Sequence, residues 1–290
     1  MVPSPAGGAI DVVARLLAEP MGRHLNQTIV IENAAGAGGN IGAGLVARSA
    51  PDGYTLLAGL NSVFTLNPHL YTNMAFDPLS DLAPVTQTVS AHLALVVNPQ
   101  LPVQSFSEFI AYAKAHPGKI SFSSNGNGSA GHITGEMLKR AAGIDMVHVA
   151  YRGAAPALND VIAGHVQATF DPLVTALPQI QAGTVRPLAV ASLKRIATLP
   201  DVPAIAETFA GFDTSGWQGL FVRAGTPVDI VTRLHAAAVA ALGTDAVRDR
   251  LRSFQFDPVG STPAAFSVSI KAEHERWGKV IKEAGIRLSQ

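Results

Sequence analysis

The chain has 290 residues, of which 48% are hydrophobic and 14% are charged, a composition that suits about two folded domains and excludes a disordered protein. Its 21 basic and 21 acidic residues balance, so no surplus of positive charge favours binding to nucleic acid or to an anionic membrane. Cysteine is absent, which excludes disulfide bonds, zinc–thiolate sites and a cysteine nucleophile.

No run of about 18 apolar residues is present, so no segment is expected to span a bilayer. No secretion signal is recognisable either. The first residues, MVPSPAGG, resemble the last residues of a strand that enters a glycine-rich turn. A domain rarely begins one residue before such a junction. We therefore expect that a leader and most of a first strand precede Met1.

Short segments rich in β-branched residues alternate with amphipathic segments along the chain, a pattern typical of α/β proteins with largely parallel sheets. The first helix shows this pattern, because apolar residues recur at near-helical spacing from Val12 to Met21. Ser105 is a suitable N-cap for the helix that begins at Phe106. In chain order, helices are expected over 11–25, 40–50, 106–115, 132–142, 156–163, 174–182, 227–242 and from 263 onward. Strands are expected over 28–33, 54–60, 93–99, 120–126, 146–153, 166–172, 185–192 and 217–225.

The same pass along the chain predicts two domains. A proline-rich stretch at Pro99 marks one boundary, and a second boundary near Gly216 lets the chain return to the first domain. We therefore predict a discontinuous lobe of residues 1–98 and 217–290 and an inserted lobe of residues 99–216, with two crossovers that form a hinge. The last helix carries an apolar stripe that predicts docking onto a core. The stripe consists of Phe266, Ile270, Trp277 and Ile281.

Two glycine-rich turns each lie between an expected strand and an expected helix, PSPAGGAID at 3–11 and SSNGNGSAGH at 123–132. Glycine lets the backbone approach a ligand closely, and the free amide groups at a helix start attract anions. Ligands of open α/β sheets bind outside the carboxyl ends of the strands, where both turns are expected. The alternative is that both are simply tight turns. Polar side chains of the second turn are Ser123, Ser124, Asn127 and Ser129.

The chemistry of the two turns favours a carboxylate ligand over a phosphate. Neither turn contains lysine or arginine, whereas phosphate sites usually recruit at least one. The Walker pattern GxxxxGK[ST] is absent, which disfavours a nucleotide. Backbone dipoles and water would then hold the carboxylate. Asp11, in the first helical turn, either accepts a hydrogen bond from a ligand or stabilises the helix N-terminus.

Two other interpretations of these motifs have less support. The stretch GAGGNIGAG at 36–44 resembles a dinucleotide-binding motif, but no acidic residue ends a following strand at the expected distance. A serine hydrolase would use Ser129 as nucleophile and His132 as base, since the two share a helix face. However, the GxSxG elbow lacks its first glycine, and no orienting acid is evident. His132 is then a neutral hydrogen-bonding side chain or a packed one.

The remaining polar candidates lie near strand ends. Asn61 and Ser62 follow a strand and are expected to face the ligand cleft. Asp171 ends another strand, where it binds a ligand amino or hydroxyl group, orients its neighbours or caps the next segment. Arg152 is either a cation for the ligand or a surface residue, and Trp217 either lines the cleft or packs in the core. The nine histidines show no metal-binding spacing, so no metal or cofactor is expected.

Several stretches, taken in order, resemble the substrate-binding proteins of tripartite tricarboxylate transporters, the Bug-type receptors. They are PAGGAIDVVARLLAEPM, VIENAAGAGGNIGA, APDGYTLL, SNGNGSAGH, MVHVAYRGAAPALNDVIAGHV, LPDVPAIAE and, near the end, WGKVIKEAGI. The resemblance covers nearly the whole chain. It implies a two-lobed periplasmic binding protein of type II, with two mixed or parallel sheets flanked by helices, that closes around a ligand.

The resemblance also implies which residues bind the ligand. One position departs from the family pattern, because Ser4 stands where the family usually has an aromatic residue after the proline of the first loop. The identity of the ligand therefore stays open. The implied ligand-binding residues are Ala6, Gly7, Gly8 and Asp11 in the first loop, Ser124, Asn127, Gly128, Ser129 and His132 in the second, and Asn61, Ser62 and Asp171 elsewhere.

The function that the resemblance implies is capture of a small carboxylate and its delivery to a membrane permease. The carboxylate would be a dicarboxylate, an amino acid or an aromatic acid. We expect a monomeric periplasmic receptor without catalytic residues, without bound nucleic acid and without membrane insertion. A sensory receptor that signals to a two-component system is one alternative. A hydrolase that uses Ser129 and His132 is the other.

Overall fold

The computed structural model of the chain describes residues 1–127 and 129–284. The chain divides into two compact units. Unit 1 consists of Met1–Ser90 and Trp217–Gln290, and unit 2 consists of Ala91–Gly216. Each unit has its own sheet and its own hydrophobic core.

The sheet of unit 1 has four strands in the order β1-β8-β2-β9. β1 and β8 are antiparallel, with Leu56 opposite Val222 and Leu60 opposite Gln218, so segments far apart in sequence become neighbours. β1 lies at one edge of this order, with β8 on one side only. The strands are β1 Leu56–Leu60, β2 Leu82–Ala91, β8 Gly216–Arg223 and β9 Phe256–Pro258.

An aromatic cluster lies at the centre of the core of unit 1. The rings of Phe64 and Phe221 stack with their centroids 4.1 Å apart, and the Trp217 ring meets Phe266 edge-on at 4.8 Å. The Trp217 indole N–H donates to Glu273 at 2.9 Å, so this tryptophan packs in the core. The helices of unit 1 are α1 Ala9–Leu25, η1 Ala37–Gly39, α2 Asn40–Ala47, α3 Asn61–Thr65, α4 Asn67–Leu70, α9 Val228–Leu242, α10 Asp245–Ser253 and α11 Pro263–Ala284.

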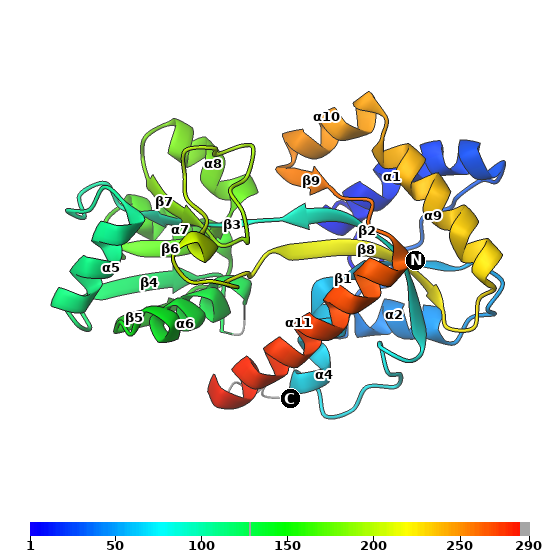
Figure 1. Cartoon of the computed structure of the whole chain (residues 1–290), viewed down its shortest axis with the longest axis horizontal. Coiled ribbons are helices and arrows are strands. Elements are labelled where there is room, and N and C mark those ends of the chain that lie inside the picture. The colour runs from blue at the N-terminus through cyan, green and yellow to red at the C-terminus, as the bar shows by residue number, and fades with distance from the viewer. Residues whose placement is uncertain (128, 285–290) are drawn as a thin grey trace. The chain divides into compact units, whose positions relative to one another are not determined.

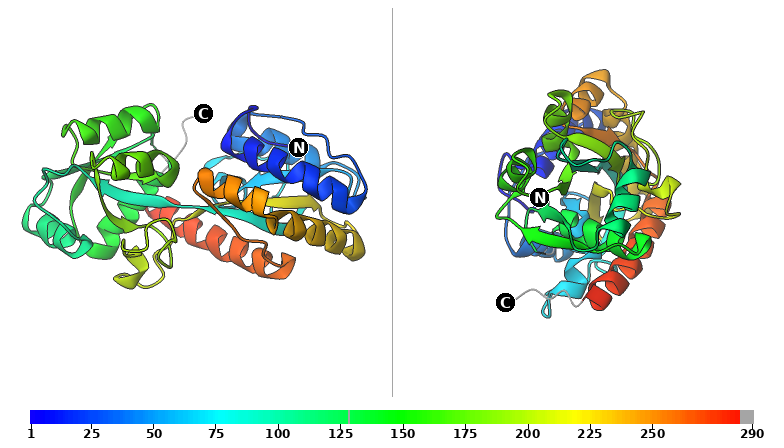
Figure 2. Two further views of the ribbon diagram at one scale, coloured as in Figure 1. Left: turned by 90° about the horizontal axis from the view of Figure 1, so that it is seen from above. Right: turned by 90° about the vertical axis from the view of Figure 1, so that its left-hand side faces the viewer.

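The helices of unit 1 combine distant parts of the chain. α1 and α9 lie side by side, and α11 packs against α3 and α4 (Figure 2). The apolar stripe predicted for the last helix is confirmed, since all four of its side chains are at most 5% exposed in α11. Among the described helices, none alone is long and apolar enough to cross a membrane, and α9 and α10 reach that composition only together, as a pair bent by 72°.

The sheet of unit 2 has five strands in the order β5-β4-β6-β3-β7. β4 is parallel to both β5 and β6, whereas β3 is antiparallel to β6 and β7. The carboxyl ends of β4, β5 and β6 therefore meet at one edge of the sheet. The strands are β3 Leu93–Val97, β4 Ile120–Ser124, β5 Met146–Ala150, β6 Ala168–Pro172 and β7 Arg186–Val190. The helices are α5 Phe106–Ala115, α6 Ala130–Ala142, α7 Ala154–Ile162, α8 Leu173–Gln181 and η2 Ile205–Glu207.

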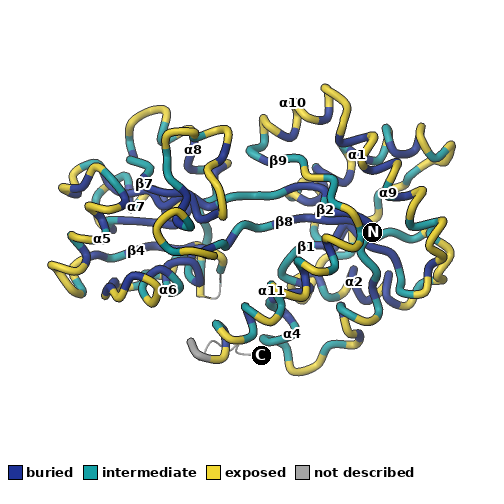
Figure 3. The backbone as a smooth tube through the Cα atoms, viewed as in Figure 1, coloured by how far each residue is buried: buried dark blue, intermediate teal, exposed yellow. Residues whose placement is uncertain are grey.

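Helices cover both faces of this second sheet, as β3 shows (Figure 1). Its Leu95 and Val97 join a core cluster with α5 and α6, whereas its Ala94 and Val96 join a cluster with α7 and α8. Because side chains alternate along a strand, β3 is buried along its whole length (Figure 3). The predicted α/β class, with two mixed sheets flanked by helices, is confirmed.

Two expectations differ from the structure. β3 belongs to unit 2, because it pairs with β6 and β7, so the first boundary lies between Ser90 and Ala91 instead of before Pro99. Residues 28–33 do not form a strand, and among them only Asn33 forms an isolated parallel bridge. A β-rich segment becomes a strand only where a neighbouring backbone pairs with it along its length.

Candidate functional site

The first predicted loop leads into the start of α1 in unit 1. Gly7 has a φ of +82°, a conformation that L side chains rarely adopt, and Gly8 is the N-cap residue of α1. Among the described residues, no side chain caps this helix, so no side-chain oxygen of theirs occupies the amide groups of its first turn. Ala6 and Gly7 are exposed and Gly8 is half-buried, which leaves the helix start accessible.

Asp11 holds this loop in place through hydrogen bonds. Its carboxylate is buried and accepts hydrogen bonds from the Gly7 N–H at 2.8 Å, from Arg15 Nε at 2.9 Å and from Asn33 Nδ2 at 2.9 Å. The Arg15 hydrogen bond lowers the pKa of Asp11 to about 2, with further help from Gly7 and Asn33. Protein donors thus occupy both carboxylate oxygens. This geometry favours the helix-stabilising role of Asp11 over direct contact with a ligand.

Arg15 and Asn33 are functional neighbours that the sequence reasoning missed. Arg15 follows Asp11 by four positions on one helix face, which is a recognisable signal for an ion pair. Asn33 carries no such signal, because its contact with Asp11 depends on the path of the chain after α1. Its amide also donates to the Ser4 carbonyl at 3.0 Å, which ties the first loop to residues 28–34.

The glycines at 36–44 allow close packing beside the first loop. A Cβ atom at Gly42 would lie 2.9 Å from Pro3 Cα and 2.9 Å from the Ala34 carbonyl oxygen. A Cβ atom at Gly39 would lie 2.9 Å from a methyl group of Val63. These glycines let α2 and η1 approach the first loop and α3 closely, which explains the motif without a dinucleotide.

Asn61 and Ser62 open the short helix α3. Both are half-buried, and their carbonyl groups accept hydrogen bonds from the Thr65 hydroxyl and the Leu66 N–H. Within the described ranges, no hydrogen bond joins either side chain to the first loop. Their expected contact with a ligand therefore stays a prediction.

The second predicted loop joins β4 to α6 in unit 2. Ser129 is the N-cap residue of α6, and its hydroxyl accepts the backbone N–H of His132 at 3.4 Å. Gly131 brings the helix start against β6, because a Cβ atom there would lie 2.6 Å from the Phe170 carbonyl oxygen. Asn127 is exposed in this loop, and Gly128 lies outside the described residues.

Two histidine rings stack at the edge where β4 and β5 end. The rings of His132 and His148 lie 3.9 Å apart and are inclined by 11°, and His148 Nε2 is hydrogen-bonded to the Ser124 hydroxyl at 2.7 Å. Burial lowers the pKa of both histidines, that of His148 to about 4, so both are neutral near pH 7. Neutral His132 matches one of its two expected roles, and the helix cap and the ring stack account for Ser129 and His132 without catalysis.

Asp171 lies at the end of β6 in the same unit. Its side chain is 2% exposed and accepts a hydrogen bond from the Thr175 hydroxyl. Burial raises the pKa of this carboxyl to about 6. A buried carboxyl of this kind gains from a ligand that donates a hydrogen bond or a positive charge. Arg152, by contrast, is exposed on the turn before α7.

The structure therefore forms two groups of predicted residues, one in each unit. Ala6, Gly7, Gly8 and Asp11 surround the start of α1 and are called the α1 site below. The α6 site consists of Ser124, Ser129, His132 and Asp171, and sequence reasoning missed His148 beside it. The signal for His148 was the alternation of side chains along β5. In the parallel register of β4 and β5, His148 lies next to Phe122. No cluster of three or more potential metal ligands occurs in the described part of the chain.

Comparison with known proteins shows the family of the chain. The model of the tripartite tricarboxylate transporter family receptor matches residues 13–286. The periplasmic binding protein BugD is 34% identical, with a TM-score of 0.74, over 99% of this chain and 97% of that one. Two Rhodopseudomonas palustris structures are also similar. Rpa4515 with adipate is 37% identical, with a TM-score of 0.78, over 99% of this chain and 97% of that one. MatC with bound malate is 34% identical, with a TM-score of 0.72, over 97% of each chain. The chain therefore belongs to the family of tripartite tricarboxylate transporter receptors, the Bug-type periplasmic solute-binding proteins.

Proposed function

We propose that the protein is a periplasmic receptor that binds a small carboxylate at two helix starts, the α1 site and the α6 site. The observation that carries this proposal is the uncapped start of α1, where glycine exposes the backbone and Asp11 holds the Gly7 amide. A carboxylate placed there accepts hydrogen bonds from the first-turn amide groups and interacts favourably with the helix dipole.

The other end of the ligand meets the α6 site in this proposal. The hydroxyl groups of Ser124 and Ser129, the neutral ring of His132 and the loop residues Asn127 and Gly128 offer hydrogen bonds without fixed charge. Asn61 and Ser62 add polar groups near the first end. Binding shifts an open–closed equilibrium only as far as the ligand prefers the closed state.

The ligand class follows from the charge of the sites and from the relatives. Neither loop contains a lysine or arginine, and Arg15 is already bound to Asp11. Relatives solved with adipate and malate carry dicarboxylates. We therefore favour a dicarboxylate, an amino acid or an aromatic acid, with water completing the shell of the carboxylate.

In this proposal, the receptor releases the ligand chemically unchanged. The monomeric receptor passes it to the membrane subunits of a tripartite permease and breaks no bond. A test of the non-enzymatic role is incubation with carboxylate esters and amides, where turnover that disappears in Ser129→Ala would contradict the receptor role.

A thermal-shift screen against small carboxylates tests the binding itself, since a ligand of the folded state raises the melting temperature by mass action. The variant Gly8→Val crowds the helix start, because a Cβ atom there lies 3.3 Å from the Pro5 carbonyl oxygen. We expect it to weaken binding at least about tenfold, a loss of about 1.4 kcal/mol.

Gly243→Val is the matched control for this variant. Gly243 has a φ of −76°, close to the −70° of Gly8, and its added Cβ atom would also lie 3.3 Å from a backbone oxygen. It lies at the end of α9, so ligand affinity should stay that of the unmodified protein. Equal affinity in Gly8→Val and Gly243→Val would remove the α1 site from the proposal.

A further inference from the structure

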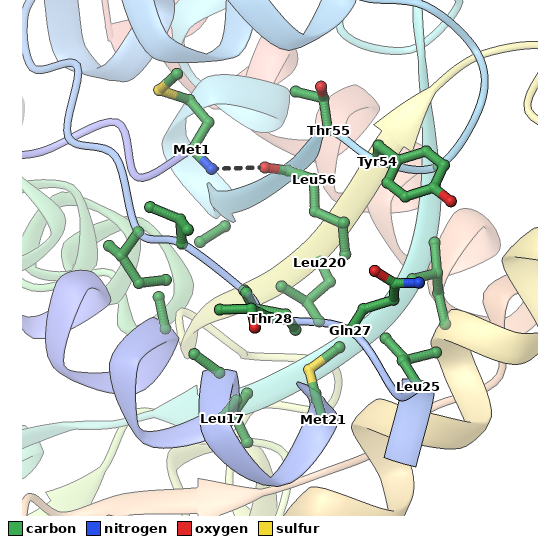
Figure 4. Close-up of a pocket in the computed structure, with 18 of the residues that line it drawn as sticks. Met1, Leu17, Met21, Leu25, Gln27, Thr28, Tyr54, Thr55, Leu56 and Leu220 are labelled. Carbon is green, nitrogen blue, oxygen red and sulfur yellow. Dashed lines mark hydrogen bonds between the residues drawn. The ribbon is translucent and has the colours of Figure 1, made fainter. Parts of the chain in front are cut away.

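A cavity in unit 1 does not include the residues of either site. It has a volume of about 520 Å³ and lies beside the carboxyl-terminal half of α1 (Figure 4). Its lining includes Leu17 and Met21 of α1 and Leu220 of β8, and none of its described lining residues belongs to the α1 site or the α6 site. The α6 site is instead shaped by contacts between its own loop and β5, where His148 lies.

The Ser124 hydroxyl is the centre of these contacts. Ser124 ends β4 and is 1% exposed. Its Oγ atom lies 2.7 Å from Nε2 of His148 and 3.0 Å from the Gly126 carbonyl oxygen, and it accepts the Gly126 N–H at 3.3 Å. Gly126 has a φ of +138°, a conformation that favours glycine. The Ser124 hydroxyl therefore connects β5 to the first bend of the loop between β4 and α6.

Further contacts connect this bend to the start of α6 and return to His148. The Gly126 carbonyl accepts the Ser129 N–H at 3.2 Å, and the Ser129 hydroxyl accepts the His132 N–H at 3.4 Å. The His132 ring stacks on the His148 ring, with the centroids 3.9 Å apart. The contacts therefore form a closed circuit that starts and ends at His148 and passes through three members of the α6 site.

β5 supplies His148 from outside the loop. In the parallel register, His148 lies opposite Phe122 of β4, and their ring centroids are 5.0 Å apart. The His148 ring is therefore held by a buried phenylalanine of the sheet as well as by His132. Because a strand supports a side chain more rigidly than a loop does, a hydrogen bond from β5 restricts the Ser124 hydroxyl more than a bond within the loop would.

The hydrogen bonds also indicate which nitrogen of His148 carries the hydrogen. Burial lowers the pKa of His148 to about 4, so the ring is neutral near pH 7 and has one N–H. The Ser124 hydroxyl has a single hydrogen as well. If Nε2 carries the ring hydrogen, it donates to Ser124 Oγ, and the hydroxyl hydrogen remains for the Gly126 carbonyl. If Nδ1 carries it, Nε2 and the Gly126 carbonyl compete for that one hydroxyl hydrogen. The Nε2–H tautomer therefore satisfies all these contacts at once.

We propose that His148, as the Nε2–H tautomer, is a positioning residue of the α6 site, because its N–H orients the Ser124 hydroxyl and thereby fixes Gly126 and the start of α6. This inference rests on the proposed function, since it assigns a part in ligand binding to a residue outside the predicted set. A loop that is already ordered loses little conformational freedom when the ligand binds, so the affinity is higher. His148 acts through Ser124 and needs no contact with the ligand.

Two variants separate the N–H of His148 from its ring. His148→Phe keeps a ring against His132 and Phe122 but has no N–H, whereas His148→Gln places an amide N–H near the position of Nε2 but has no ring. We expect His148→Phe to weaken ligand binding at least about tenfold and His148→Gln to stay within about threefold of the unmodified protein. His116→Phe is the matched control and should leave the affinity unchanged, because His116 is an exposed histidine of the same unit whose ring stacks on Tyr112 at 4.2 Å.

Isothermal titration calorimetry with the dicarboxylates adipate and malate measures the affinity. Equal affinity of His148→Phe and the unmodified protein would overturn the inference and leave the proposed function in place. An equal loss of affinity in both His148 variants would assign the effect to the ring and would also overturn the inference. If the unmodified protein bound neither probe, that result would count against the proposed ligand class, and measurements on the ligand-free protein would still decide the role of His148.

Nuclear magnetic resonance of the ligand-free protein provides these measurements. The nitrogen chemical shifts of the His148 ring should show the hydrogen on Nε2 near pH 7. Amide hydrogen exchange of Gly126 and Ser129 should be at least about fivefold faster in His148→Phe than in His148→Gln, because the bend loses its support when the N–H is removed. A hydrogen on Nδ1, or equal exchange in the two variants, would contradict the inference whatever the affinity for the probes.

Discussion

Replacing Asp171 by asparagine tests the electrostatics of the α6 site. The carboxyl is 2% exposed, and burial raises its pKa from 3.8 to about 6. Asparagine keeps the shape and an oxygen that accepts the Thr175 hydroxyl, but it does not ionise. The substitution therefore removes the cost of a buried charge and leaves the local packing in place.

The magnitude follows from the pKa. A rise from 3.8 to about 6 corresponds to about 3 kcal/mol of unfolding free energy. Below about pH 3.8 the side chain is neutral in both proteins, so their stabilities should agree. As the pH rises from about 4 through about 6, Asp171 ionises at a cost in the folded state, whereas asparagine does not. Above about pH 7 the variant should be more stable by about 3 kcal/mol.

The assay is urea unfolding of the ligand-free protein, followed by far-ultraviolet circular dichroism between about pH 4 and pH 8. Circular dichroism is preferable to fluorescence, because Trp217 and Trp277 both lie in unit 1 and Asp171 lies in unit 2. Asp201→Asn, at an exposed position of unit 2, is the control and should change stability little at any pH. A variant no more stable than the unmodified protein at about pH 8 would refute the reasoning.

Three further variants test the two sites. His148→Phe keeps a ring against His132 but cannot protonate. The unmodified protein should lose stability as the pH falls from about 6.5 to about 4, because the histidine protonates only when unfolded, and in urea melts the variant should lose less. Asp11→Ala removes the acceptor of the Gly7 N–H and should lower stability at about pH 7 by about 2 kcal/mol in urea melts. The contribution of Asp11 is present above about pH 3.8 and is lost as the pH falls through about 2. Gly131→Ala forces a Cβ atom against the Phe170 carbonyl and should cost about 2 kcal/mol in thermal unfolding.

A different outcome would contradict each of these three predictions. An unchanged loss of stability on acidification in His148→Phe would assign that loss to other groups. Asp11→Asn retains one acceptor oxygen and should lose less than Asp11→Ala, so equal losses would argue against the hydrogen bonds as the cause. Full stability of Gly131→Ala would mean that α6 moves away from β6 without cost.

Local patterns in the sequence were sufficient for most of the helices and for the polar ends of the strands. Ser105 caps its helix, Asp171 ends β6, and the last helix buries its apolar stripe, as predicted. α10 was not predicted, because charged residues surround its two buried apolar residues, Val247 and Leu251, in the sequence. β2 was also missed, since the polar residues Thr86, Gln87 and Thr88 interrupt its apolar ones.

The sequence by itself determined the α/β class, the two glycine-rich helix starts and the family resemblance, because periodicity, caps and motifs are properties of neighbouring residues. Only the tertiary structure decided that β3 belongs with unit 2, that Asn33 holds Asp11, that His148 stacks on His132, and that residues 28–33 remain irregular. Each of these depends on a partner distant in the chain or on an adjacent strand edge. Pairing of that kind arises only when the chain has folded, since backbone hydrogen bonds and buried charges are satisfied by whatever comes to lie beside them.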